Sequence, residues 1–290
     1  MKGRMKRAYC KYITALLLFG LNGIVASHID LSSHEIVLLR TFIGSMLLMG
    51  IYFLRKGKIT FYKHKKQFFF LCISGMAMGT SWMFLYEAYA QIGVSIASLL
   101  YYCGPVMVMA VSPVLFKERL TIQKMIGFLA VLCGIFLVNG SAWSGNNLFG
   151  IFCGMMSAVM YAFMVIFNKK AAEITGLENS MLQLLISFLT VAVFVGIRQG
   201  FALEIPKTSI IPILILGLLN TGIGCYFYFS SIGKLPVQTV AICGYLEPLS
   251  AVLFSVILLQ EQMLLPQIMG AVLIIGGAVF AECFQKVHQS

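Results

Sequence analysis

The sequence predicts an all-α integral membrane protein with ten transmembrane helices, arranged as two inverted five-helix repeats. Three observations lead to this fold class: the composition, the length and spacing of the apolar runs, and an internal repeat. The chain of 290 residues is 60% hydrophobic and only 11% charged. Because a soluble protein of this size needs more polar residues to cover its surface, we place the chain in a lipid bilayer.

Ten apolar runs of about 20 residues divide the chain, and each is long enough to cross about 30 Å of hydrocarbon. In the first half, the expected helices span residues 9–27, 34–54, 67–89, 93–116 and 122–140. In the second half, they span residues 147–168, 178–198, 209–231, 236–259 and 264–284. The connections are short, and no soluble domain or low-complexity linker fits between the helices.

A set of Tyr, Pro, Glu and Gly positions occurs twice, with an offset of 143 residues. The first copy is Tyr102, Pro105, Glu118, Gly127 and Gly134, and the second is Tyr245, Pro248, Glu261, Gly270 and Gly277. We therefore predict two structural units, residues 1–143 and residues 144–290. Since each unit has an odd number of spans, the second enters the membrane upside down, as in transporters whose substrate site lies near the midplane.

Lys and Arg residues are distributed unevenly between the two sides of the predicted membrane. Eighteen lie in the termini and loops on one side, whereas only Arg198 and Lys207 lie on the other. Because basic loops stay in the cytoplasm, we expect both termini there and the protein in the inner or plasma membrane. The net charge of +11 then needs no nucleic-acid partner, because the basic residues lie in short loops. The first 27 residues could pass for a signal peptide, but the repeat favours a retained first helix.

Neither metal binding nor catalysis is indicated by the motifs. The eight cysteines lie in or beside apolar runs, without a CxxC pair or a nearby His cluster, so we interpret them as packing residues. The sequence contains no HExxH, no GxSxG and no Walker A motif. We therefore expect no enzyme activity, no catalytic residue, no metal and no cofactor.

Both copies of the repeat resemble the drug/metabolite transporter superfamily, specifically its ten-helix EamA-type members. The first copy reads FLYEAYAQIGVSIASLLYYCGP, KERL and QKMIGFLAVLCG, and the second reads YFYFSSIGKLPVQTVAICGYLEP, LQEQ and PQIMGAVLIIGG. Gln262 departs from the family pattern by replacing an Arg, in a loop expected to face outward. The resemblance implies a secondary exporter of amino acids or related small metabolites, and it leaves the substrate and the coupling ion open.

Two charged residues are expected inside the membrane. Glu247 lies near the middle of the ninth span, where a charged group costs about 2.5–3.5 kcal/mol unless it is paired, protonated or hydrated. We interpret it as a functional residue beside a helix break at Pro248, matched by a break at Pro105; capping the broken helix or pairing with Arg40 is the alternative. Arg40 can bind a substrate carboxylate, and the alternatives are snorkelling or pairing with Glu87 or Glu247.

Aromatic and amide side chains complete the predicted site. Trp82, Tyr86 and Tyr89 share one helical face, which indicates either the wall of a hydrated cavity or an interfacial aromatic belt. For Asn22 and Asn220, bonding between helices is favoured over substrate binding. Glu118 and Glu261 are expected to cap the fifth and tenth helices. The predicted substrate-binding set is Arg40, Trp82, Tyr86, Glu87, Tyr101, Tyr102, Tyr245, Glu247, Asn22 and Asn220.

The leading functional hypothesis is export of amino acids or related metabolites by alternating access between the repeats. Its partners are a small-molecule substrate, the lipid bilayer and protons as the candidate coupling ion. One alternative is proton-coupled efflux of lipophilic cations, although Arg40 would repel them. Another is a membrane scaffold that transports nothing. The sequence leaves both a monomer and a homodimer open.

Overall fold

A computed structural model describes residues 2–57, 59–116, 122–139, 147–200, 203–232, 243–244 and 246–283. Within these residues, all regular secondary structure is helical. Five helices are long and apolar enough to cross a membrane by themselves, and shorter apolar helices lie in the fourth, fifth, ninth and tenth expected spans. The predicted all-α, multi-pass membrane fold is therefore confirmed.

The first half of the chain forms five spans. The first consists of α1 (Lys2–Gly20) and α2 (Asn22–Ala26), and the second is α3 (Ser33–Leu54). A 3-10 turn, η1 (Phe61–Lys63), precedes the third span, α4 (Lys65–Ile92). The fourth span is divided into α5 (Val94–Tyr101) and α6 (Cys103–Phe116), and the fifth is α7 (Ile122–Asn139).

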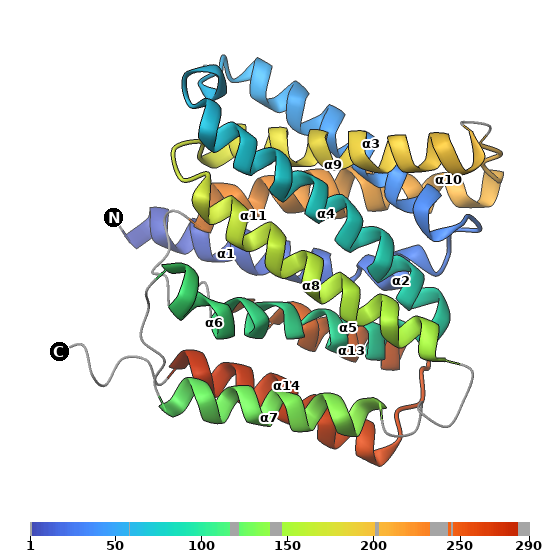
Figure 1. The fold of residues 1–290 in the computed structure, drawn as a ribbon. Helices are drawn as coiled ribbons and strands as arrows, with labels where there is room; N and C mark the ends of the chain where they lie inside the picture. The colour runs from blue at the N-terminus through green and yellow to red at the C-terminus, as the bar shows by residue number, and fades with distance from the viewer. Residues whose placement is uncertain are drawn as a thin grey trace.

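The second half repeats this order in the opposite direction. Its first two spans are α8 (Leu148–Lys170) and α9 (Gly176–Gln199). The next consists of α10 (Lys207–Leu214), the π-helix η2 (Ile215–Ile223) and α11 (Gly224–Ile232), followed by α13 (Leu246–Leu258) and α14 (Leu265–Cys283). Figure 1 shows α1 starting at the end of the molecule where α8 finishes, which is the inverted relationship that the sequence predicts.

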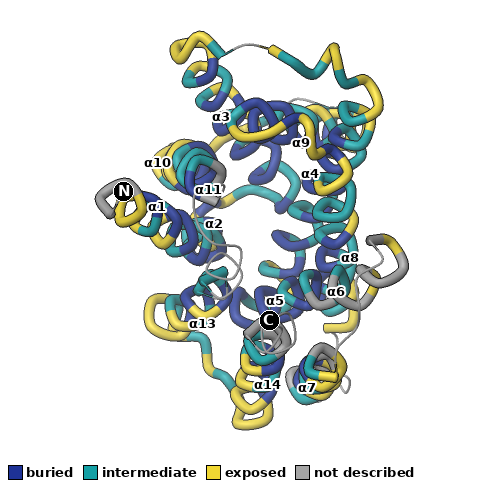
Figure 2. Tube along the Cα trace, turned by 90° about the vertical axis from the view of Figure 1, so that its left-hand side faces the viewer, coloured by how far each residue is buried: buried dark blue, intermediate teal, exposed yellow. Residues whose placement is uncertain are grey.

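The helices surround a central region, and their buried residues face inward. Figure 2 shows α1, α3, α4, α5, α8, α11 and α13 around this centre, with exposed residues on the periphery. The exposed residues on the outer helix faces are largely apolar, for example Phe136 and Val272, each 66% exposed. Apolar side chains facing outward fit a protein surrounded by lipid.

The repeated glycines are explained by the crossing of α7 and α14. A Cβ atom on Gly134 would lie 2.7 Å from the carbonyl oxygen of Gly270, and one on Gly277 would lie 2.9 Å from the carbonyl oxygen of Gly127. Since the 143-residue offset exchanges the two pairs, each repeat supplies the same two contacts. The glycine spacing therefore encodes a close contact between the last helices of the two repeats.

A second close crossing positions α3 against the π-helix η2. Cβ atoms on Gly217 and Gly222 would lie 2.7 Å and 2.5 Å from the side chains of Ile43 and Leu47. These glycines let the two backbones approach, and they bring the middle of α3 next to η2. A π-helix is uncommon, and it occurs most often at functional sites.

The structure corrects the expected role of Glu261. Its carboxylate accepts hydrogen bonds from the backbone N–H groups of Val94 at 2.7 Å and Ser95 at 2.9 Å, so it caps α5 of the first repeat. The prediction that it caps the tenth helix is wrong, because the side chain reaches across to the other repeat. At the start of α14, Gln267 Oε1 instead accepts from the backbone N–H of Leu264 at 2.8 Å. The matching residue, Glu118, lies outside the described residues.

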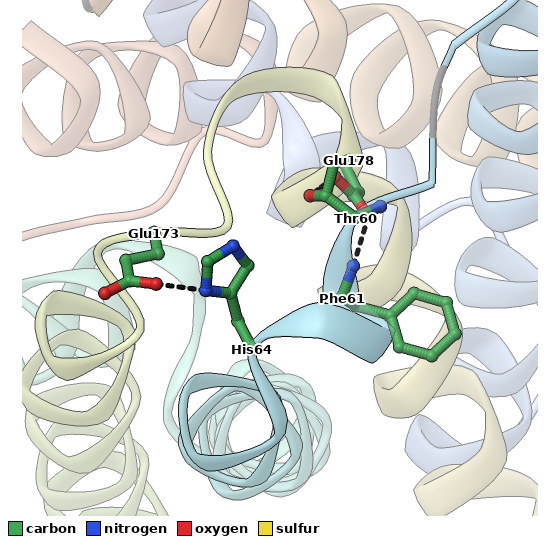
Figure 3. A network of polar contacts seen from close by, with 5 residues as sticks. All are labelled: Thr60, Phe61, His64, Glu173 and Glu178. Carbon is green, nitrogen blue, oxygen red and sulfur yellow. Dashed lines mark hydrogen bonds and ion pairs between the residues drawn. The ribbon is translucent and has the colours of Figure 1, made fainter.

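A second contact between the repeats lies at the opposite end of the molecule (Figure 3). Glu178, at the start of α9, accepts hydrogen bonds from the backbone N–H groups of Thr60 at 2.6 Å and Phe61 at 3.0 Å. His64 and Glu173 form an ion pair beside them. The loop before α4 is thus attached to the first turn of α9.

Candidate functional site

Arg40 lies at the centre of the interface between the repeats, with only 1% of its surface exposed. Its Nε donates a hydrogen bond to Thr221 Oγ1 at 3.0 Å, and its Nη1 donates to the hydroxyl of Tyr86. Its Cζ lies 4.3 Å from the ring centroid of Trp82 and 5.0 Å from that of Tyr86. The remaining nitrogen, Nη2, makes no hydrogen bond to any described residue, so this buried cation keeps free donors.

Glu247 faces the same central region from the first turn of α13. The partial positive charge of a helix N-terminus stabilises a carboxylate there. The carboxylate interacts electrostatically with Arg40, but no ion pair within 4.0 Å joins the two among the described residues. The buried hydroxyl of Tyr102 makes no hydrogen bond to any described residue, and it lies near enough to Glu247 for the two groups to interact electrostatically. Opposite charges therefore approach the same region without neutralising each other by direct contact.

Tyrosines from both repeats surround these charges. The ring centroids of Tyr101 and Tyr102 lie 5.2 Å apart, and those of Tyr101 and Tyr161 lie 5.1 Å apart. On the other side, Tyr86 and Tyr89 are separated by 5.2 Å. The electrostatic interactions of Glu247 extend to tyrosines on α1, α4, α5 and α11, namely Tyr12, Tyr89, Tyr101 and Tyr228. We call Arg40, Trp82, Tyr86, Tyr101, Tyr102, Thr221 and Glu247 the central cluster.

Six residues of the predicted set belong to the central cluster, and three do not. Glu87 accepts hydrogen bonds from Ser33 Oγ at 2.8 Å and Gln91 Nε2 at 3.0 Å, so it connects α3 and α4 away from Arg40. The Nδ2 of Asn220 donates to Asn22 Oδ1 at 3.1 Å and to the carbonyl of Leu18 at 2.9 Å. These two amides join the first span to η2, as expected of bonds between helices. Tyr245 lies outside the described residues.

The helix interruption in the fourth span is close to the expected proline without coinciding with it. In the fourth span, α5 ends before Tyr102, and Pro105 lies in the first turn of α6. Pro248 likewise lies in the first turn of α13. Proline is favoured at this place because the first turn of a helix needs no backbone donor there. Pro105 therefore lies at the start of the second segment of its span, just after the interruption at Tyr102. Tyr245, which precedes α13, lies outside the described residues.

Sequence reasoning missed Thr221 as the partner of Arg40, and it missed Tyr12 and Tyr161 at the edge of the cluster. Thr221 lies on the π-helix, and its Oγ1 also donates a hydrogen bond to the carbonyl oxygen of Leu216, five residues earlier, at 2.8 Å. A signal was available, because Pro212 and the Asn220-Thr221-Gly222 run are unusual within an apolar span. Hydropathy alone does not distinguish a π-helix from an α-helix.

Comparison with known proteins identifies the family. The sequence profile of the EamA-like transporter family matches residues 6–140 and, a second time, residues 148–282. The chain belongs to the EamA-like transporter family. It is thus a multi-pass membrane transporter of the EamA type, which points to transport rather than catalysis.

Similar proteins carry transporter names. The chain is 24% identical to the uncharacterized transporter YxxF of Bacillus subtilis (strain 168), over 93% of this chain and 88% of that protein. It is 25% identical to the uncharacterized transporter YoaV of the same organism, over 85% of each chain. One solved crystal structure matches with a TM-score of 0.68 at 17% identity, over 96% of this chain and 97% of the solved chain, which shows the shared fold alone.

The two repeats of this EamA-like transporter have kept one contact while changing its chemistry. The offset of 143 residues relates Arg40 to Gln183 and Thr221 to Met78, and Gln183 Nε2 lies 3.5 Å from Met78 Sδ. The same side chain donates to Ser74 Oγ at 3.2 Å and accepts from Asn168 Nδ2 at 2.6 Å. Among the described residues, the neutral copy is therefore satisfied by hydrogen bonds, whereas Arg40 carries a charge and keeps donors without a described acceptor.

Proposed function

We propose that this EamA-like transporter exports amino acids or closely related zwitterionic metabolites across the cell membrane. The observation that carries the proposal is the buried guanidinium of Arg40, which has free donors and no acidic group in direct contact among the described residues. A buried charge is costly unless it is paired. A substrate carboxylate supplies that partner, and it binds the planar guanidinium through two parallel hydrogen bonds.

The rest of the central cluster matches the other parts of an amino acid. Glu247 offers a carboxylate for the α-ammonium group, and the tyrosine hydroxyls offer further acceptors. Trp82 and Tyr86 place their ring centroids 4.3 Å and 5.0 Å from Arg40 Cζ, and these cation–π contacts help to hold the guanidinium in place. The aromatic rings provide an apolar surface for the substrate side chain, as is typical of small-molecule sites.

Transport follows from the position of the cluster between the repeats. Arg40 and Trp82 come from the first unit, proposed as residues 1–143, and Thr221 and Glu247 come from the second, proposed as residues 144–290. In inverted-repeat transporters, rocking of one repeat against the other opens such a site to each side in turn. Glu247 is the candidate carrier of a coupled proton.

Reconstituted protein tests the proposal. A thermal-shift screen over amino acids, organic acids and organic cations first selects a ligand, because binding stabilises the protein by RT ln(1+[L]/Kd). Counterflow of the selected, radiolabelled ligand is then measured in proteoliposomes, with and without a proton gradient, for the wild type and Glu247→Gln. We expect exchange of an amino acid. Movement of no amino acid would contradict the proposal.

Efflux of lipophilic cations is the second candidate function. It is favoured by the tyrosines around Glu247, since aromatic faces and a carboxylate bind organic cations. Arg40 counts against it, because the guanidinium would repel a cation in the same region. In the same proteoliposomes, movement of a quaternary ammonium without movement of amino acids would favour cation efflux. Movement of neither would favour a scaffold.

A further inference from the structure

Two cationic side chains converge on one tyrosine at the end of the molecule that carries the basic loops. The Nζ of Lys11, on α1, lies 5.0 Å from the ring centroid of Tyr226, and the Cζ of Arg55, at the end of α3, lies 4.9 Å from it. Arg55 Nη2 also donates a hydrogen bond to the hydroxyl of Tyr226. Lys11 lies 5.5 Å from the ring of Phe227 as well. Residues from three helices and both repeats therefore form this group, which we call the basic mouth.

The positive charge of the basic mouth is not compensated by the described residues. Neither Lys11 nor Arg55 makes an ion pair with any acidic group that the structure describes. Because both lie near the same ring, their charges are separated by at most about 10 Å, a distance at which like charges repel. Lys11 is also partly buried, whereas Arg55 is exposed. An oxyanion from solution would relieve the repulsion and accept the free donors of both side chains.

The basic mouth is connected to the central cluster by the same two structural elements. Arg40 lies on α3, and Arg55 directly follows its last residue, 15 positions later, which corresponds to about 22 Å along the helix axis. Tyr226 lies on α11, which continues directly from the π-helix that carries Thr221. The local chemistry is also alike, because each arginine lies over the ring of a tyrosine and donates to that tyrosine's hydroxyl. An anion held at one arginine thus has a second, similar site deeper along the same helices.

We propose that Lys11, Arg55 and Tyr226 form a second oxyanion-binding site, which captures the carboxylate of the substrate before it reaches Arg40. This inference rests on the proposed function for the identity of the substrate. Capture at the mouth raises the local concentration of an anionic or zwitterionic ligand and accelerates its association, an effect that added salt suppresses. The site itself is a property of the free protein and is therefore testable without transport.

Equilibrium binding of carboxyfluorescein, a soluble dye with free carboxylates, tests the site. Its fluorescence anisotropy is measured with the full-length protein in neutral detergent micelles, as salt is increased. We expect the double variant Lys11→Gln/Arg55→Gln to raise the Kd at least about tenfold, since charge-assisted hydrogen bonds are lost. Lys11→Arg/Arg55→Lys retains both charges and should keep most of the affinity. Unchanged binding in the Gln double variant would overturn the proposal.

Arg198→Gln is the matched control. Arg198 corresponds to Arg55 through the 143-residue offset, and its Cζ lies 5.9 Å from the ring of Phe194 on its own helix. The Arg198→Gln variant should bind carboxyfluorescein with the same Kd as the wild type. If Arg198→Gln loses as much affinity as the double variant, the dye reports only general positive charge, and the proposal fails.

An anionic lipid headgroup offers the same chemistry and is tested separately. The wild type and the double variant are placed in nanodiscs of phosphatidylcholine alone, or with added phosphatidylglycerol, and their thermal unfolding is compared. A phosphatidylglycerol effect that is lost in the double variant, together with unchanged dye binding in micelles, would assign the site to lipid and overturn substrate capture.

In transport assays, substrate capture at the basic mouth predicts that the double variant has a raised KM and an unchanged kcat. If the wild type moves no amino acid, the proposed function fails while the dye measurement still decides whether the site exists.

Discussion

Arg40 donates a hydrogen bond from Nε to Thr221 Oγ1 at 3.0 Å, and so connects α3 of the first repeat to η2 of the second. The two residues are 181 positions apart, and both are buried. Thr221 and Tyr86 together fix two of the three guanidinium nitrogens. The third, Nη2, makes no hydrogen bond to any residue that the structure describes, and under the proposed function a substrate carboxylate would accept from it.

Thr221→Val should destabilise the protein by about 1–3 kcal/mol, because it leaves Nε as a buried charged donor without an acceptor. Valine keeps nearly the same shape, so packing changes contribute little. Thr221→Ser restores the hydroxyl and should recover most of the loss. Unfolding in detergent measures both variants, and wild-type stability in Thr221→Val would mean that Arg40 does not depend on this bond.

Glu261→Ala should also cost about 1–3 kcal/mol, since the N–H groups of Val94 and Ser95 lose a charged acceptor at the start of α5. Gln262→Ala is the control, because its exposed neighbouring side chain makes none of these bonds. Chemical denaturation of the two variants gives the comparison. Equal stabilities would remove Glu261 from the contact between the repeats.

Gly277→Ala and Gly276→Ala should differ although the residues are adjacent. A Cβ on Gly277 would lie 2.7 Å from Ala130 Cβ and 2.9 Å from Gly127 O, whereas one on Gly276 meets no atom within 4 Å. Overpacking at Gly277 should therefore cost about 1–3 kcal/mol, while Gly276→Ala should be neutral or stabilising because Ala favours the helix. Thermal unfolding of both variants tests the α7–α14 crossing. Wild-type stability in Gly277→Ala would contradict the close approach of the two helices.

Single cysteines introduced as Lys63→Cys and Asp30→Cys should be labelled from opposite sides of the membrane. Asp30 precedes α3, whereas Lys63 lies between the end of α3 and the start of α4, and both residues are exposed. Exposed Cys10 is first replaced by Ser to lower the background. An impermeant maleimide, applied to right-side-out and inside-out vesicles, should reach Lys63→Cys only from the cytoplasm. Labelling of both positions from one side would contradict the predicted spans, and reversed labelling would contradict the orientation.

Hydropathy and the repeat were sufficient to predict the ten spans and the inverted arrangement. Both are properties of long stretches, and errors at single residues average out. Arg40, Trp82, Tyr86, Tyr101, Tyr102 and Glu247 could likewise be placed in one region, because charges and aromatic hydroxyls at membrane depth need partners that lipid does not supply.

The pairings between particular side chains could not be predicted in the same way. Glu261 caps a helix 166 residues earlier, and Arg40 bonds to a threonine that lies on a π-helix. Both contacts depend on which helices distant in the sequence cross, and the sequence pattern does not identify the crossing partner. Glu87 was attractive for its charge, but the nearby Ser33 and Gln91 satisfy its carboxylate.

The most direct test of the central claim compares one amino acid with its α-amide, which lacks the carboxylate charge. Equilibrium binding of both ligands is measured for the wild type, Arg40→Lys and Trp82→Ala, with the amino acid selected by the thermal-shift screen. If Arg40 reads the carboxylate, the wild type should prefer the acid by about tenfold or more, since a charge-assisted bond contributes about 1.5–3 kcal/mol. Arg40→Lys should remove most of this preference, because an ammonium cannot form the two parallel bonds, whereas Trp82→Ala should keep it while changing the order of preferred side chains. If Arg40→Lys weakens both ligands equally, or neither, Arg40 is not the carboxylate-binding residue, and cation efflux becomes the better account.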